Sequence, residues 1–143
     1  MKDEKLFPKE TIIITKYFDI HQDWEVPIPG FFIIALKRKV SSIGDFTKEE
    51  AQEFFELLYK LRKGMKDILK IKHVYLFQTE DAEQRFHLWI FPRFDWMEKF
   101  GRKSESIRPI INYAKENMVT KEVFKEVKDM VKKMKKYMED SVK

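Results

Sequence analysis

The chain of 143 residues is long enough for one folded domain with a hydrophobic core, and its 43% hydrophobic and 15% aromatic content is far from that of a disordered protein. It has no cysteine, which excludes disulfide bonds and thiolate metal sites, and it has no Gly-rich fingerprint of a dinucleotide-binding or P-loop site. Its 29 basic and 24 acidic residues are interleaved, so the net charge of +5 indicates a solvated surface more than a nucleic-acid-binding stripe.

The first quarter of the chain predicts two strands joined by a loop. Residues 11–18 are rich in β-branched and aromatic side chains and predict the first strand. Residues 19–30 are polar and contain Pro27 and Pro29, which favour an extended loop over a central strand. Residues 31–36 form a nearly continuous apolar run, which predicts the most buried strand.

A long helix is predicted to follow Thr47. Thr47 and Glu50 have the spacing of a capping box, in which each side chain bonds to the backbone of the other residue. Gly64 interrupts the helix at a cost of about 1 kcal/mol relative to alanine. Apolar residues at three- and four-residue spacing predict its core face: Phe54, Phe55, Leu57, Leu58, Leu61, Met65, Ile68 and Leu69.

Two further strands, at residues 73–78 and 85–93, are separated by the short polar turn 79–84. This arrangement predicts an antiparallel hairpin. Side chains alternate across a strand, so one face of the second strand is purely apolar and is expected to be core. That face carries Phe86, Leu88 and Ile90.

The opposite face of the same strand carries a cation, an imidazole and an indole, from Arg85, His87 and Trp89. A strand needs such a face only where it lines a cleft or meets a partner. Imidazole changes its protonation near neutral pH, so His87 is the candidate nucleophile or acid/base. From this pattern alone, a surface or packing role for His87 is the commoner outcome.

After Arg93 the pattern changes to an aromatic, irregular loop at residues 94–103, which is able to cover a site. Residues 109–114 predict a short helix with Pro109 in its first turn. Thr120 caps a longer helix that packs on the body of the protein or on a second subunit. Its apolar stripe comprises Val123, Val127, Met130, Met134, Tyr137 and Met138. The lysines at 132–136 are read as a solvated face.

The remaining histidines, His21 and His73, are expected to be surface residues, because neither has a neighbour at metal-ligand spacing. No metal or organic cofactor is therefore expected. The chain begins with a charged segment and has no run that approaches a membrane span, so the cytoplasm is the expected compartment.

Three blocks of the sequence resemble the histidine-triad (HIT) superfamily: Pro29–Val40 (PGFFIIALKRKV), Phe46–Ala51 (FTKEEA) and Arg85–Arg93 (RFHLWIFPR). The resemblance implies an α+β fold with an antiparallel sheet, packed helices and a C-terminal helix. It further implies one HIT-like domain over residues 1–143, with a core at about 11–100 and a helical extension at about 106–143. Homodimers are usual in the family.

The triad itself is altered, because its three positions are Arg85, His87 and Trp89 and only the middle one is histidine. In the family the middle histidine attacks the α-phosphorus of a nucleotide, and water or another acceptor resolves the nucleotidyl-histidine. By resemblance His87 inherits that role, and Arg85 is expected to stabilise phosphate charge. Further histidines frequent in the family are replaced by Phe31 and Lys39.

The resemblance also places other contacts to the substrate. For phosphate or leaving group we expect the polar side chains of Gln78, Thr79 and Gln84. For the nucleoside we expect apolar residues of the first strands and of the 23–30 connector, with a carboxylate for the ribose: Phe18, Trp24, Phe32 and Ile34, with Asp19 or Asp23. Trp89, Lys39 and Arg93 complete the expected contacts.

The implied function is hydrolysis or transfer at a nucleotide α-phosphate through His87, with dinucleoside polyphosphates or nucleoside phosphoramidates as substrates. A second hypothesis is a nucleotide-binding module that has lost turnover together with two triad positions. A third is a basic nucleic-acid-binding protein, which the mixed charges make the least favoured.

Overall fold

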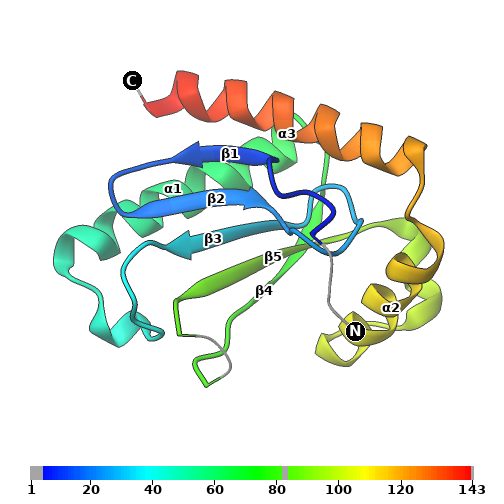
Figure 1. Cartoon of the computed structure of the whole chain (residues 1–143), viewed down its shortest axis with the longest axis horizontal. Helices are drawn as coiled ribbons and strands as arrows, with labels where there is room; N and C mark the ends of the chain where they lie inside the picture. The colour runs from blue at the N-terminus through cyan, green and yellow to red at the C-terminus, as the bar shows by residue number, and fades with distance from the viewer. Residues whose placement is uncertain (1–4, 82–83, 143) are drawn as a thin grey trace.

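The computed structural model describes residues 5–81 and 84–142, and these form a five-stranded antiparallel sheet with helices on both faces (Figure 1). The α+β fold with a C-terminal helix is as predicted. The strand order is β1-β2-β3-β5-β4. The strands are β1 (Thr11–Ile14), β2 (Phe18–Gln22), β3 (Phe32–Leu36), β4 (His73–Phe77) and β5 (His87–Arg93). The helices are α1 (Lys48–Asp67), α2 (Ile107–Asn117) and α3 (Lys121–Val142), with short 3-10 helices η1 (Ile43–Asp45), η2 (Asp95–Phe100) and η3 (Ser104–Ser106).

Residues 11–22, predicted as one strand and the start of a loop, form a β-hairpin instead. The chain turns at Thr15, whose hydroxyl accepts a hydrogen bond from the backbone N–H of Phe18 at 3.1 Å. Strand β2 then pairs along its whole length with β3, so the expected loop at residues 19–30 is wrong over its first four residues. Pro27 and Pro29 follow β2 and leave its ladder intact.

The two faces of the sheet carry separate hydrophobic clusters. Even-numbered residues of β2, β3 and β5 pack against α1 and α3. Odd-numbered residues of β3 and β5 lie on the other face, where α2 covers Phe31 and Phe91. The alternation places three of the expected nucleoside contacts in the first cluster, fully buried beneath α1 and α3: Phe18, Phe32 and Ile34. Those three expectations are wrong.

The start of α1 is as predicted, because Thr47 and Glu50 form both hydrogen bonds of a capping box. Arg38, two residues after the end of β3, donates two further hydrogen bonds to the Glu50 carboxylate, at 2.9 and 2.8 Å. The predicted core face of α1 is correct for its buried residues Leu57, Leu61 and Met65. It is wrong for Phe55 and Ile68, which are 66% and 42% exposed.

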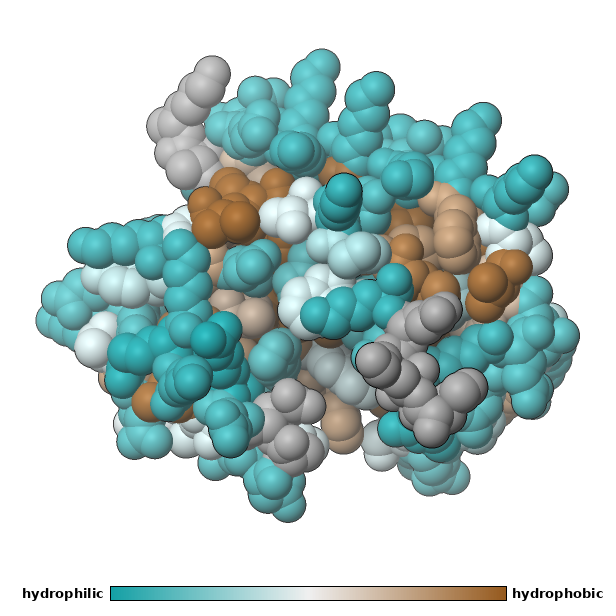
Figure 2. Space-filling model, viewed as in Figure 1, coloured by the Kyte–Doolittle hydropathy of each residue, from teal (hydrophilic) through white to brown (hydrophobic). Residues whose placement is uncertain are grey.

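Helix α3 packs across β1 and α1. Of its predicted stripe, Val127, Met134 and Met138 are buried, and the other three residues are half-buried. Gly64 permits its close approach to α1, since a Cβ atom at this position would lie 2.6 Å from the Tyr137 ring. The outer surface along α3, at the top of Figure 2, is mostly hydrophilic, in keeping with a solvated lysine face. Among the described residues, no helix is long and apolar enough to cross a membrane.

Candidate functional site

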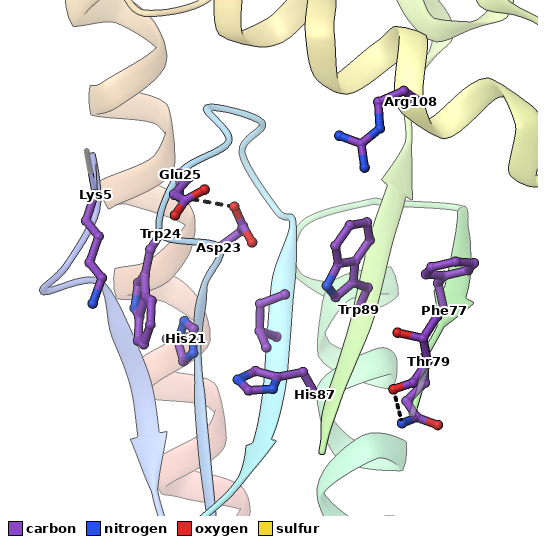
Figure 3. A pocket seen from close by; sticks show the side chains of 12 residues that line it. Lys5, His21, Asp23, Trp24, Glu25, Phe77, Thr79, His87, Trp89 and Arg108 are labelled. Carbon is purple, nitrogen blue, oxygen red and sulfur yellow. Dashed lines mark hydrogen bonds between the residues drawn. The ribbon is translucent and has the colours of Figure 1, made fainter. Parts of the chain in front are cut away.

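A cleft of about 500 Å³ opens on the α2 face of the sheet, beside the area that α2 covers (Figure 3). Its lining comes from the start of the described chain, the end of β2, the middle strands, the end of β4 and the first turn of α2. The lining residues are Lys5, His21, Asp23, Trp24, Glu25, Ile33, Phe77, Gln78, Thr79, His87, Trp89 and Arg108. This set includes six of the residues that the sequence predicts for the site: Asp23, Trp24, Gln78, Thr79, His87 and Trp89.

His87, the first residue of β5, is half-buried and faces the cleft. Its Nδ1 atom lies 3.0 Å from the carbonyl oxygen of Arg85. A carbonyl oxygen only accepts, so Nδ1 donates this bond, and in the neutral ring the free lone pair is on Nε2. The residue opposite His87 on β3 is Ala35, whose small side chain leaves space beside the imidazole. This arrangement is suited to nucleophilic attack by Nε2.

Arg85 lies in a bend before β5, since the strand begins at His87 and not at residue 85 as the sequence predicts. Its side chain is exposed and is not part of the cleft lining. The expected guanidinium on the same face as His87 is therefore displaced from the site. What Arg85 contributes is its main-chain carbonyl.

Trp89, at the third triad position, forms an apolar wall of the cleft. Its ring packs edge-on against Phe31 at a centroid distance of 5.2 Å and lies 5.6 Å from the ring of Phe77. The indole N–H is a donor, but an indole cannot carry a proton to or from a substrate. Trp89 can therefore shape and contact a ligand without taking part in proton transfer.

His21 is buried, with 4% of its surface exposed, and lines the cleft, so the expectation of a surface residue is wrong. Its ring stacks on Trp24 at 4.6 Å, and the Lys5 ammonium lies 4.1 Å from the same indole. Its Nδ1 donates to the carbonyl oxygen of Gln22 at 2.8 Å. Burial lowers the pKa of the His21 imidazole, outweighing the opposing effects of that carbonyl and of nearby carboxylates.

Asp23 follows β2 and lines the cleft next to Trp24. Its Oδ2 atom accepts hydrogen bonds from the backbone N–H groups of Glu25 at 3.1 Å and Val26 at 2.9 Å. Burial raises the pKa of this carboxyl, although the two N–H groups favour its ionised form. Asp19, the other expected ribose contact, is outside the lining, and its Oδ1 is buried with no hydrogen-bond partner among the described residues.

The polar residues expected around the phosphate divide into two groups. Gln78 and Thr79 line the cleft, and the Gln78 amide donates to the carbonyl oxygens of Ser41 and Thr79. Gln84 and Lys39 are exposed and outside the lining. Part of the predicted turn at residues 79–84, namely 82–83, lies outside the described residues.

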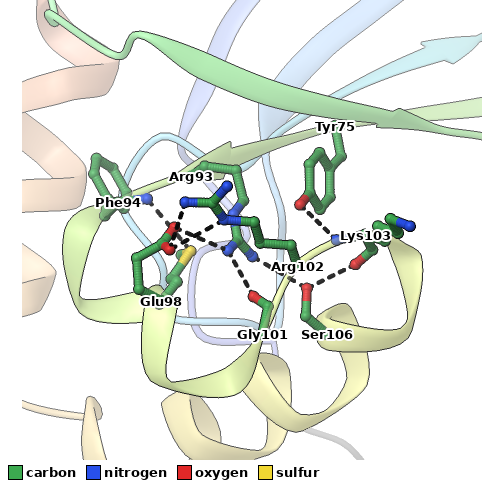
Figure 4. A network of polar contacts seen from close by, with 9 residues as sticks. Tyr75, Arg93, Phe94, Glu98, Gly101, Arg102, Lys103 and Ser106 are labelled. Carbon is green, nitrogen blue, oxygen red and sulfur yellow. Dashed lines mark hydrogen bonds and ion pairs between the residues drawn. The ribbon is translucent and has the colours of Figure 1, made fainter.

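Arg93 is also outside the cleft, in a polar network that holds the segment before α2 (Figure 4). Its side chain is only 7% exposed and donates to Ser106 Oγ at 3.1 Å and to the Gly101 carbonyl oxygen at 2.9 Å. The guanidinium also lies 5.0 Å from the ring of Tyr75. Arg93 is thus an anchor for η2, η3 and the start of α2.

This anchoring brings Arg108, in the first turn of α2, to the cleft near Trp89 (Figure 3). The sequence does not single out Arg108, because its position depends on how α2 packs on the sheet. Within residues 5–81 and 84–142, no cluster of three or more His, Asp or Glu side chains is arranged to hold a metal ion.

No family model and no curated protein matches the sequence. Among solved structures, a Zn-bound histidine triad family protein from Mycobacterium smegmatis has a TM-score of 0.61 at 12% identity, covering 95% of this chain and 89% of that one. A Hit-like protein involved in cell-cycle regulation from Bartonella henselae, solved with an unknown ligand, has a TM-score of 0.60 at 15% identity, covering 89% and 84%.

The NitFhit protein of C. elegans has a TM-score of 0.54 at 15% identity over 74% of this chain, which spans only 26% of the NitFhit chain. At 12–15% sequence identity, the similarity to these three structures shows the fold of the chain. The chain has a HIT-like fold, as the three sequence blocks predict.

Proposed function

We propose that the cleft binds a nucleotide and that His87 attacks its α-phosphorus to give a nucleotidyl-histidine, which water or another acceptor then resolves. The observation that carries the proposal is the hydrogen bond from His87 Nδ1 to the Arg85 carbonyl. This bond selects the tautomer in which Nε2 has a free lone pair, as a nucleophilic imidazole requires. The protein is, on this proposal, a divergent member of the HIT superfamily.

The cleft offers a place for each part of a nucleotide. Asp23 and Trp24, at the end of the cleft away from His87 in Figure 3, suit the ribose hydroxyls and the nucleoside. Gln78 and Thr79 suit the phosphate or leaving group, and Trp89 can donate its indole N–H. Arg85 acts through its carbonyl, which orients the nucleophile.

Two substrate classes fit this chemistry, dinucleoside polyphosphates and nucleoside phosphoramidates, since both present an α-phosphorus with a leaving group. A cleft of about 500 Å³ is within the usual size range for small-molecule sites. The reaction needs no metal or organic cofactor, and we place it in the cytoplasm, where nucleotides are made and broken down.

The test is incubation with a dinucleoside polyphosphate that carries a label on the α-phosphate. We expect labelled nucleoside monophosphate as product, and transient label on the protein that is absent in His87→Ala. His73→Ala is the matched control, since His73 is exposed at the start of β4 and outside the cleft. Equal labelling of the His87→Ala protein would rule out His87 as the nucleophile.

The replacement of two triad histidines, by Arg85 and Trp89, favours one other function, a nucleotide-binding module without turnover. That function predicts saturable binding of nucleotides with neither product nor covalent label. The same incubation, combined with calorimetric binding of the unlabelled nucleotide, decides between the two.

We also propose that the protein forms a homodimer through β4. This strand is an edge of the sheet, and its Leu76 is 53% exposed. Exposed apolar edge strands are prone to pair with another chain. Light scattering is expected to give a dimer for the wild type and a monomer for Leu76→Lys; a monomeric wild type at high concentration would exclude the dimer.

A further inference from the structure

Two imidazoles line the cleft, and the proposed reaction uses only one of them. They are held in the same way: His87 Nδ1 donates to the Arg85 carbonyl at 3.0 Å, and His21 Nδ1 donates to the Gln22 carbonyl at 2.8 Å. In the neutral form of each ring the free lone pair is therefore on Nε2. In Figure 3 the His87 ring reaches across β3 toward the ring of His21.

The strand register explains why the two rings face each other. His87 on β5 is paired with Ala35 on β3, and His21 on β2 is paired with Ile33, two residues along β3. The histidines are thus diagonal neighbours across β3, on strands separated by roughly 10 Å. A phosphorus bonded to His87 Nε2 would lie in the cleft that His21 also lines.

We propose that His21 is the general base that activates the acceptor water in the second half of the reaction. The role of His21 rests on the proposed function of His87. The water oxygen forms a bond to phosphorus as the bond from phosphorus to His87 Nε2 breaks. The electron pair of that bond returns to His87 Nε2, and the proton of the water passes to His21 Nε2. The His21 imidazolium then releases the proton to solvent.

The surroundings of His21 suit this role. Burial lowers the pKa of its imidazole, so the ring is neutral at neutral pH and able to accept a proton. The carboxylates of Asp19 and Asp23 act in the opposite direction and stabilise the imidazolium once it forms. A positive charge on His87 acts with burial and lowers the pKa of His21 further.

The two carboxylates that line the cleft, those of Asp23 and Glu25, are less well placed for the base role. Both residues follow the end of β2, and in Figure 3 both carboxylates lie farther from the His87 ring than the His21 ring does. Asp23 lies two residues beyond His21, farther from the Ala35–His87 pair, and its Oδ2 is already bonded to two backbone N–H groups. In Figure 3, His21 lies between Asp23 and His87. His21 is therefore the proton acceptor of the cleft lining that the strand register brings nearest to the nucleophile.

The proposal separates the two half-reactions. A phosphate leaving group departs as an anion without a proton, so formation of the nucleotidyl-histidine does not need His21. Attack by water does need a base, and general-base catalysis commonly contributes about 10²–10⁴-fold. Loss of His21 should therefore leave formation of the adduct nearly unchanged and slow its hydrolysis.

The experiment follows the covalent label in the His21→Asn protein, whose amide can still donate to the Gln22 carbonyl but cannot accept a proton. We expect the label to appear as in the wild type and to persist at least about 100-fold longer. Fluoride, an anionic acceptor that needs no base, should discharge the adduct at the same rate in both proteins. His21→Phe, which keeps the stack on Trp24, should behave as His21→Asn does.

Release of label from His21→Asn and His21→Phe as fast as from the wild type would overturn the role of His21 alone. Slow discharge by fluoride as well as by water would show a structural role and would also overturn it. Absence of label on the wild type would overturn the proposed function, and the role of His21 with it.

Discussion

The Nδ1 atom of His87 donates to the carbonyl oxygen of Arg85, two residues earlier, over 3.0 Å. This contact is to the main chain, while the Arg85 guanidinium is exposed and outside the cleft. We therefore expect Arg85→Ala to form the nucleotidyl-histidine at close to the wild-type rate, as measured by rapid-quench labelling. A fall of about a hundredfold or more, the usual cost of losing a donor to a developing negative charge, would show that the guanidinium acts on phosphate.

Substitution of Arg93, at the other end of β5, should affect the stability of the fold, because its guanidinium is buried. Lysine cannot bond both Ser106 Oγ and the Gly101 carbonyl in this geometry, so Arg93→Lys should lower the free energy of unfolding by about 2 kcal/mol. Urea denaturation measures the change. The control is Arg102→Lys, because Arg102 is 75% exposed and should cost almost nothing. Equal, small effects of both substitutions would contradict an anchoring role.

Glu50 makes stability depend on pH in the acid range. The two hydrogen bonds from Arg38 lower the pKa of the Glu50 carboxyl from 4.5 to about 2. A carboxyl group whose pKa is lower in the folded than in the unfolded protein stabilises the fold at pH values above its unfolded pKa. This stabilisation is lost as the pH falls from about 5 to about 2. Urea unfolding at several pH values should show the wild type losing its advantage over Glu50→Gln in this window.

Glu50→Gln is the suitable comparison because the glutamine amide oxygen preserves the capping box with Thr47, while the charge and the second acceptor oxygen for Arg38 are lost. If the two unfolding free energies ran parallel from pH 7 to pH 2, the ion pair with Arg38 would not contribute.

Replacement of Gly64 by alanine should lower the free energy of unfolding, although Gly64 lies inside a helix. Helix propensity alone predicts that Gly64→Ala stabilises by about 1 kcal/mol. The added Cβ would lie 2.6 Å from the Tyr137 ring and 2.8 Å from the end of Met134, so we expect a net loss of about 1–3 kcal/mol. Thermal or urea unfolding measures it. The loss should shrink in a Tyr137→Ala background, and an unchanged loss would contradict steric contact as its cause.

The local features of the fold could be predicted from the sequence because short-range interactions determine them. The capping box of Thr47 and Glu50 spans three residues, and the apolar face of β5 follows from alternation along one strand. The position of His87 on the opposite face follows from the same alternation. The resemblance of three sequence blocks then gave the HIT-like fold.

The rest of the site depends on contacts between distant segments, which single-residue patterns do not reveal. His21 was expected in a loop because of the prolines that follow it, yet pairing of β2 with β3 extends the strand and buries the imidazole. Arg108 reaches the cleft because α2 packs on the sheet, and Arg93 anchors the segment before that helix. Arg85 leaves the site because the chain bends before β5.

The most direct test of the central claim is a crystal structure of the protein with a bound nucleoside monophosphate. We expect the phosphorus within about 3.5 Å of His87 Nε2, the distance of a near-attack arrangement, with Nδ1 still bonded to the Arg85 carbonyl. A phosphate bound away from the imidazole, or a ring turned so that Nε2 faces the protein, would contradict nucleophilic catalysis by His87.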